Sequence, residues 1–334
     1  MRYIQSFSTS GDVQTAIDNG SLGKPYVAYI QDGQYIDWNS KTIDYTNMPL
    51  TFKITSDGIL KIYNSSSYSN AKYSINGADE VVLNCNETVE LNVVNGDKVV
   101  YKISNWGNYY QAFKNSTAGF KVYGNPKFGI NNIDSLDFRE VFYGCTGLTD
   151  ASNLILSETT LLNNCYQSMF QNCTSLTTAP ELPATTLANN CYNRMFYNCT
   201  SLTTAPALPA TTLAEGCYLN MFYNCTSLTT APELPATTLA SHCYRNMFYN
   251  CTSLTTAPEL PATTLASRCY YYMFYNCTSL NYIKCLATDI TASNCTTNWV
   301  SGVSQTGTFV KNANMSDWTT GTNGIPNGWT VIDA

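Results

Sequence analysis

The sequence predicts a mixed β/α fold, in which a β-rich N-terminal part is followed by a solenoid of 26-residue coils and a C-terminal cap. The main observation is an internal repeat. The 26 residues from Ser175 to Thr200 recur almost unchanged three more times, starting at Ser201, Ser227 and Ser253. A repeat of this length and fixed period indicates a solenoid, because one coil cannot bury its apolar face alone but a stack of coils can.

Residues 1–45 are expected to form a small N-terminal unit, which we interpret as an attachment segment. Ser10 can cap a short helix over 12–17. The apolar stretches on either side of Asp32-Gly33 are typical of a β-hairpin, since this dipeptide is a strong two-residue turn signal.

Residues 46–125 alternate polar and β-branched residues over several short stretches. Turn signals at Asp57-Gly58 and Asn95-Gly96 separate these stretches. Several short strands at this spacing predict a β-sandwich-like domain.

Residues 126–295 are expected to form the solenoid, with each coil made of a short strand, a turn and a short helix. The first half of a coil is extended and contains two prolines, Pro180 and Pro183 in the copy from Ser175. Because proline removes a backbone donor, the hydrogen-bonded strand must be short. In the second half, apolar residues fall four apart, which predicts a helical face of Leu187, Cys191, Met195 and Cys199.

Residues 296–334 lose the repeat period and contain Trp318 and Trp329. A solenoid needs an atypical end to cover its last apolar face. We therefore expect a C-terminal cap over 296–334.

The 14 cysteines mostly fall into two columns with the period of the repeat. The columns contain Cys165, Cys191, Cys217, Cys243, Cys269 and Cys295, and Cys145, Cys173, Cys199, Cys225, Cys251 and Cys277. We interpret them as small buried apolar residues of the core rather than as disulfides, which the spacing alone also permits. No C-x2-C pair is present and the one histidine is not repeated, so neither a metal site nor a cofactor is expected.

Composition narrows the class of function. Charged residues make up 12% of the chain and the net charge is −6, which argues against nucleic-acid binding. No stretch approaches the roughly 18 apolar residues of a membrane span, so membrane insertion is not expected. The first twenty residues lack the continuous apolar core of a secretion signal, and we interpret the chain as made and assembled in a cytoplasm.

Two dipeptide columns vary between coils while the segment TSLTTAP does not change. Residues of the types found there are common in adaptable recognition surfaces, although exposed positions also vary without a function. We expect these residues to project from the convex side of the helical turn and to bind a partner. They are Asn189, Asn190, Asn193, Arg194, Glu215, Asn220, Ser241, His242, Arg245, Asn246, Arg268, Tyr271 and Tyr272.

Three further columns have alternative interpretations. Glu181, Ala207, Glu233 and Glu259 form either a solvated rim or a site for a cation or basic partner. Two tyrosine columns, beginning at Tyr192 and Tyr197, either seal neighbouring coils or stack sugars. Catalysis is not expected, because a nucleophile needs an adjacent base and His242 lies in a variable column.

The segment MFYNCTSLT, at residues 195–203 and in register in the other coils, resembles the BspA-like leucine-rich repeats of the Treponema type. In that class, each coil contains an aromatic residue, two further residues and then Cys-Thr-Ser-Leu. The resemblance covers about 140–295 and departs from the class in its coil length and doubled prolines. It implies a leucine-rich-repeat solenoid used for adhesion and for contacts with proteins or glycans at a surface.

Residues 3–30 and 318–331 are similar to segments of structural proteins from Bacteroidales and their crAss-like gut phages. This similarity implies a non-enzymatic protein of the virion surface, a head fibre or decoration protein. It would dock on a phage capsid protein by its N-terminus and present the solenoid to a host-surface or mucosal protein or glycan. A homo-oligomer, as a trimer, is expected by analogy with fibres. The alternative is a bacterial cell-surface adhesin or glycan-binding module.

Overall fold

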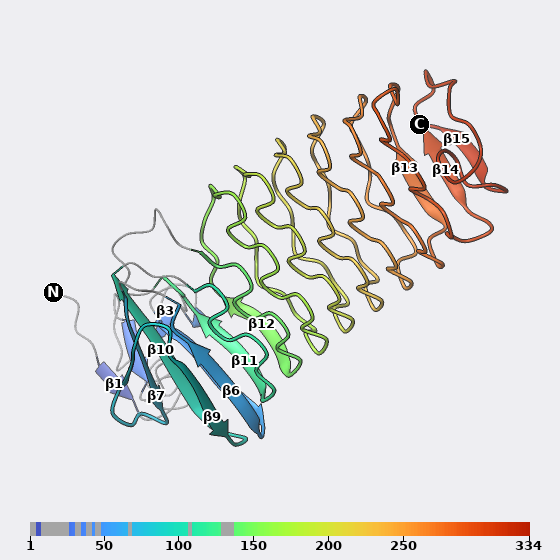
Figure 1. Cartoon of the computed structure of the whole chain (residues 1–334). Coiled ribbons are helices and arrows are strands. Elements are labelled where there is room, and N and C mark those ends of the chain that lie inside the picture. Colours follow the sequence, from blue (N-terminus) through green and yellow to red (C-terminus); the bar gives the residue numbers. More distant parts are fainter. Residues whose placement is uncertain are drawn as a thin grey trace, which may run out of the picture.

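The computed structural model describes residues 48–65, 69–105, 109–127 and 137–334, together with the backbone of four short strands nearer the N-terminus. Figure 1 shows an elongated molecule, with the labelled strands of the β-rich part at one end. The repeat coils then follow side by side toward the C-terminus at the other end.

The four short strands form a sheet in the order β1-β2-β3-β4. Their bounds are β1 Gln5–Phe7, β2 Val27–Ile30, β3 Tyr35–Asp37 and β4 Thr42–Ile43. β2 and β3 pair in antiparallel register, so the predicted hairpin is confirmed. The predicted helix after Ser10 and the Asp32-Gly33 turn itself lie outside the described residues.

The next region consists of a six-stranded sheet and a two-stranded sheet. The larger sheet has the order β12-β11-β5-β10-β7-β8, with β5 Leu50–Ser56, β7 Ser69–Ile75, β8 Val81–Leu83, β10 Lys98–Asn105, β11 Gly119–Gly124 and β12 Leu148–Leu154. The smaller sheet pairs β6 Gly58–Tyr63 with β9 Thr88–Val93. The two predicted turn dipeptides therefore connect strands of different sheets instead of closing hairpins.

The six-stranded sheet leads directly into the coils. β11 pairs in parallel with β12, which belongs to the first coil of the repeat region. Phe52 of β5 is fully buried and its ring lies 4.5 Å from that of Phe113 and 6.4 Å from that of Phe142, measured between ring centroids. The apolar core is thus continuous from the β-rich part into the solenoid.

The helical part of the predicted mixed β/α class is wrong, because the described residues contain no helix. In place of each predicted helix, ten residues form consecutive turns, which we call a turn segment. The turn segments are 163–172, 189–198, 215–224, 241–250, 267–276 and 293–302. The coils are therefore those of a β-solenoid built from bridges and turns.

The backbone of a turn segment has a two-residue alternation. Odd positions donate three residues back within the coil, as the Met195 N–H does to the Tyr192 carbonyl. Even positions donate to the next coil, as the Phe196 N–H does to the Met221 carbonyl. The second, sixth and tenth residues have positive φ, for example Asn190 at 55°. One left-handed residue in every four reproduces the four-residue spacing of apolar side chains that resembles a helical face.

The extended half of each coil pairs with its neighbours through isolated parallel bridges, among them Thr186 with Thr212 and Thr212 with Thr238. The expectation of very short hydrogen-bonded strands is confirmed. Regular strands return near the C-terminus, where β13 Tyr282–Cys285, β14 Thr308–Lys311 and β15 Thr330–Asp333 form a parallel sheet.

The interior of the solenoid consists of columns of identical side chains. Phe222 is fully buried, and its ring lies 5.6 Å from that of Phe196 and 5.8 Å from that of Phe248. Tyr218 is buried in a parallel column that stacks on Tyr192 and Tyr244. Of the two interpretations of this first tyrosine column, the structure supports the one in which the rings seal neighbouring coils.

The cysteine columns are free thiols within this interior, and the prediction of buried core cysteines is confirmed for both columns. The thiols also have a polar role. Cys199 donates through Sγ to the Phe170 carbonyl at 3.1 Å, and Cys225, Cys251 and Cys277 repeat this contact with the matching phenylalanine carbonyls. The Phe170 carbonyl also accepts the backbone N–H of Cys173, so the thiol adds a second hydrogen bond to a carbonyl that is already paired.

The last coils are covered by tryptophan. Trp299 is fully buried and stacks on Tyr270 at 5.9 Å and on Trp318 at 5.6 Å. Trp329 is also buried and donates through Nε1 to the Ser304 carbonyl. These contacts close the apolar columns at the C-terminal end.

Candidate binding surface on the turn segments

The outward positions of the turn segments form one continuous surface along the solenoid, which we call the turn face. The two variable columns occupy the first, second, fifth and sixth positions of each segment. Because every coil has the same backbone hydrogen bonds there, the side chains at these positions change while the main chain does not. The structure therefore brings the sequence-predicted residues together on one surface.

The exposure of the predicted residues differs. Asn189, Arg194, Glu215 and Arg268 are exposed, whereas Asn190, Asn193, Ser241, His242, Arg245, Asn246, Tyr271 and Tyr272 are half-buried. Asn220 is a correction, because it is buried and its Oδ1 accepts a hydrogen bond from Asn246 Nδ2 at 2.9 Å. Its positive φ and this contact give Asn220 a structural role instead of an outward one.

Asparagine is frequent on the turn face for a conformational reason. The left-handed region is accessible to asparagine and glycine at low cost, and it is costly for bulky residues. Most left-handed positions of the turn segments are asparagine or glycine, with five exceptions: Ser168, Arg194, His242, Arg268 and Tyr272. The recurrence of asparagine every four residues was the sequence signal that could have identified turns instead of a helix.

The tenth residues of the first five turn segments form an asparagine ladder that sequence reasoning did not predict. The Nδ2 of Asn198 donates to Asn172 Oδ1 at 3.0 Å, and Asn276 donates to Asn250 at 2.6 Å. Asn224 and Asn250 continue the same series between these two contacts. The ladder joins successive coils, so this invariant column serves folding.

The second tyrosine column lies beside the ladder and is half-buried. The rings of Tyr197 and Tyr223 are 4.6 Å apart, those of Tyr223 and Tyr249 are 4.4 Å apart, and those of Tyr249 and Tyr275 are 4.7 Å apart, with interplanar angles of 7°, 6° and 13°. Sugars stack on ring faces, and these faces are covered by neighbouring tyrosines. This second tyrosine column therefore presents ring edges, and not ring faces, to solvent.

A second arrangement of side chains interrupts this regularity over two coils. We call it the cationic–aromatic cluster, and it consists of His242, Arg245, Arg268, Tyr271 and Tyr272. The Arg245 guanidinium carbon lies 4.9 Å from the centroid of the Tyr271 ring, and the Tyr271 and Tyr272 centroids are 4.5 Å apart at an angle of 54°. Arg268 Nη1 lies 3.5 Å from His242 Nε2. These two half-buried tyrosine rings are tilted against each other instead of stacked in parallel, and the Arg245 guanidinium lies over the Tyr271 ring.

The electrostatics of the cluster are dominated by its two arginines. Partial burial lowers the pKa of His242, and the positive charges of Arg245 and Arg268 lower it further, while Glu215 opposes the shift. The Glu215 carboxylate is 3.9 Å from His242 Nδ1, and Ser241 Oγ lies 2.8 Å from the same atom. Among the described residues, the ion pairs of the solenoid include neither arginine of the cluster. The cluster is a local positive surface on a chain of net charge −6.

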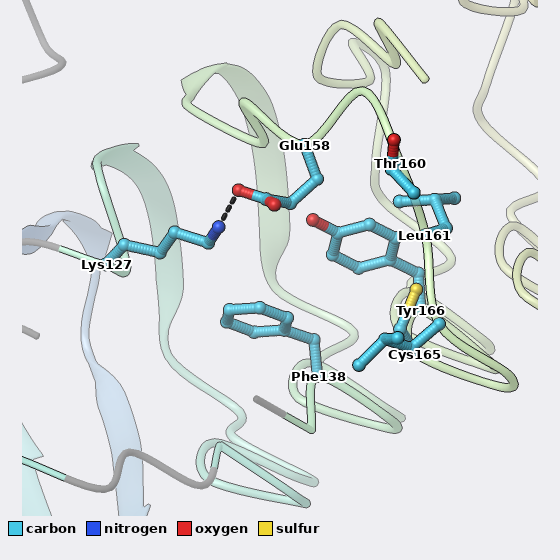
Figure 2. Close-up of a pocket in the computed structure, with 8 residues that line it drawn as sticks. Lys127, Phe138, Glu158, Thr160, Leu161, Cys165 and Tyr166 are labelled. Carbon is cyan, nitrogen blue, oxygen red and sulfur yellow. Dashed lines mark ion pairs between the residues drawn. The ribbon is translucent and has the colours of Figure 1, made fainter. Parts of the chain in front are cut away.

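A pocket near the start of the solenoid is too small to hold a ligand of ordinary size. Figure 2 shows Lys127 reaching the Glu158 carboxylate above the rings of Phe138 and Tyr166. The cavity has a volume of about 40 Å³, which is room for a few water molecules and far below that of a typical ligand pocket. Burial raises the pKa of the Cys165 thiol at its edge to about 12, so this thiol is a poor nucleophile.

The glutamate column lies at the solvent-exposed surface of the extended half of each coil. Glu181, Ala207, Glu233 and Glu259 are all exposed, and Glu259 forms an ion pair with Lys284 at 3.1 Å. Within the described ranges, no group of three or more potential ligands is placed to hold a metal ion. In the same part of the chain, no helix has the length and apolarity that a membrane crossing requires.

Comparison with known protein families identifies the repeat. A model described as the BspA type leucine-rich repeat region matches residues 131–232 and 218–298, with six copies in all. No curated protein and no solved structure matches the chain. The resemblance inferred from MFYNCTSLT is confirmed, and the match covers half of the chain.

Proposed function

The chain belongs to the BspA-type leucine-rich repeat family, and from that premise we propose that it is a non-enzymatic binding module whose turn face contacts a protein or glycan at a biological surface. The family favours an adhesin-like role of this kind. The proposal assigns binding to the variable first, second, fifth and sixth positions of the turn segments.

One observation supports the turn face above other surfaces. Threonines of the extended halves, such as Thr203, Thr229 and Thr255, are as exposed as the outward turn residues, yet they do not vary between coils. Exposure alone therefore does not account for the variation on the turn face. Diversity concentrated on one surface of a constant backbone is the arrangement that recognition requires.

The chemistry of the described residues supports a non-enzymatic role. The solenoid thiols are buried, and burial raises the pKa of Cys217 and Cys225 to about 12. The one histidine has Ser241 beside it, but its position is variable between coils. A general base needs a bound substrate within hydrogen-bonding distance, and an open surface positions one poorly.

The proposal is tested with a turn-face variant that carries Arg194→Asn, Glu215→Asn, Arg245→Asn and Arg268→Asn. Each replacement is the residue that another coil has at the same position, so the backbone is preserved. A matched control carries Glu181→Ala and Glu233→Ala, for which Ala207 is the natural example. We expect wild type and control to bind the same members of an array of host-surface glycans and extracellular proteins, and the turn-face variant to lose them. Equal binding by all three would refute the assignment.

A narrower form of the proposal places the module on a phage particle, docked on a capsid protein through residues 1–45. Its support is the resemblance to phage structural proteins that we infer from the sequence of residues 3–30 and 318–331 alone, which the family match does not include. Proteomics of purified virions should then detect the chain, and native mass spectrometry should give a trimer. Detection on a bacterial cell surface and absence from virions would favour the adhesin alternative.

A further inference from the structure

We propose that the cationic–aromatic cluster is a subsite for an acidic sugar, that is, a sugar ring that carries a carboxylate, such as a uronic acid or a sialic acid. This inference rests on the proposed function of the turn face and adds the chemical class of the ligand. Three independent features of the cluster carry it.

The first feature is conformational strain that folding does not require. His242, Arg268 and Tyr272 all have positive φ, at 58°, 52° and 53°. The equivalent positions in other coils are mostly asparagine or glycine, which adopt this conformation at lower cost. Three of the five exceptions in the turn segments lie together in the cluster. Strained backbone positions of this kind concentrate at functional sites, where the function of the side chain maintains a residue that is unfavourable for folding.

The second feature is that neither arginine of the cluster has a carboxylate partner among the described residues, although Arg245 lies over the Tyr271 ring. Arg245 Nε is buried and makes no hydrogen bond within the part of the chain that the structure describes. A buried donor without a partner is unfavourable, and a carboxylate of a ligand would supply the acceptor. Arg268 is exposed and can approach the same anion. The charged and polar groups around His242 are Glu215, Ser241 and the two arginines. A ligand carboxylate bound near the arginines would therefore meet a net positive charge.

The third feature is aromatic surface beside that charge. Tyr272 lies 5.1 Å from Tyr275 and 6.4 Å from Tyr249, centroid to centroid, at angles of 48° and 36°. Tyr272 is half-buried and is tilted against both of these neighbours, whereas the rings of the second tyrosine column are stacked in parallel. A partly exposed aromatic side chain next to an arginine suits a sugar ring whose apolar side packs on the aromatic ring while its carboxylate pairs with guanidinium.

The test uses the full chain and three trisaccharide probes: trigalacturonate, 3′-sialyllactose and neutral galactotriose. Isothermal titration calorimetry should detect binding of at least one acidic probe and at least tenfold weaker binding of galactotriose. The two acidic arms distinguish a uronic acid from a sialic acid. Inorganic phosphate is titrated as a simple anion, and phosphate binding as tight as that of both acidic probes would overturn the proposal.

Two matched variants separate binding from folding. Arg268→Asn removes a cluster charge and relieves a left-handed arginine, so it should weaken the acidic probe at least tenfold while raising the melting temperature by about 1–2 °C. Lys53→Gln also removes one positive charge, but from an exposed position of β5 outside the turn face, and it should leave the affinity unchanged. Equal affinity in both variants would refute the subsite.

The outcome also separates this inference from the proposed function. If the turn-face variant loses array ligands that are all neutral, the turn face binds and the acidic-sugar subsite is wrong. If the array ligands do not depend on the turn face, the proposed function itself fails.

Discussion

The β-rich part and the solenoid stabilise their surfaces in different ways. Between residues 48 and 127, outward side chains are held by individual ion pairs, as Glu80 is by Lys72 at 3.2 Å and Lys102 at 2.6 Å. In the solenoid, stability comes from columns that repeat in every coil and from backbone bonds between coils. From this comparison we infer that a stacked fold places most of its stability in the inward columns, which leaves the outward turn positions available for recognition.

The largest expected difference between the two regions is in alkaline stability. Burial raises the pKa of the solenoid thiols above their ordinary value of about 9, to about 12 for Cys191, Cys217 and Cys269 among others. Each such thiol contributes stability that is fully present below pH 9 and is lost as the pH rises toward 12, because the unfolded state ionises first. One thiol lowers the free energy of unfolding by about 1.4 kcal/mol per pH unit in this window, and the columns add their effects.

We therefore expect the solenoid to unfold between pH 9 and 12, before the β-rich part, whose described cysteine, Cys85, is exposed. Pulsed iodination read by peptide mass spectrometry measures this, with Tyr218 reporting on the solenoid and Tyr101 on the β-rich part, since both are buried. Simultaneous reaction of the two tyrosines would mean that the regions unfold as one unit.

Replacing Phe222 by alanine tests the column of stacked rings. The change should lower the free energy of unfolding by about 3–5 kcal/mol, because it leaves a cavity between Phe196 and Phe248. Thr255→Ala, at an exposed position of the extended half, is the control and should stay within about 0.5 kcal/mol. Urea denaturation measures both, and similar losses would show that the interior face has been assigned wrongly.

Replacing Asn224 separates the two roles of the asparagine ladder. Asn224→Ala should cost about 2–3 kcal/mol, since it loses the amide contacts with Asn198 and Asn250 and places alanine at a φ of 59°. Asn224→Gly keeps the conformational freedom and should cost about 1 kcal/mol less. Equal losses in thermal unfolding would show that the left-handed conformation contributes nothing.

The smallest expected effect is that of a reducing agent. All described thiols are free, so reductant should leave the melting temperature unchanged. Native alkylation should modify Cys85 quickly and the other 13 only after unfolding, as mass spectrometry can count. A native mass lower by two hydrogens per cysteine pair, with a melting temperature that falls in reductant, is the contrary result.

The sequence was sufficient to predict the period, the core columns and the free thiols, because identical residues in stacked coils must share one environment. It was misleading for Leu187, Cys191, Met195 and Cys199, whose four-residue spacing fits both a helix and a series of turns. The distinguishing evidence was asparagine recurring at four-residue spacing, such as Asn220 and Asn224, which disfavours a helix interior.

The candidate site was predicted in part for the same reason. Variation between coils located the turn face, but it could not show that Asn220 turns inward to accept a hydrogen bond from Asn246. It also could not distinguish the covered faces of the Tyr223 column from the tilted ring of Tyr272, because ring angles depend on packing between coils.

The central claim is that folding does not need the outward turn side chains and that binding does. Measuring the free energy of unfolding of the turn-face variant against wild type tests this most directly. The account predicts a difference within about 1 kcal/mol, because each replacement already occurs in another coil and two of them relieve left-handed arginines. A loss of several kcal/mol would contradict it and would show that these side chains hold the coils together.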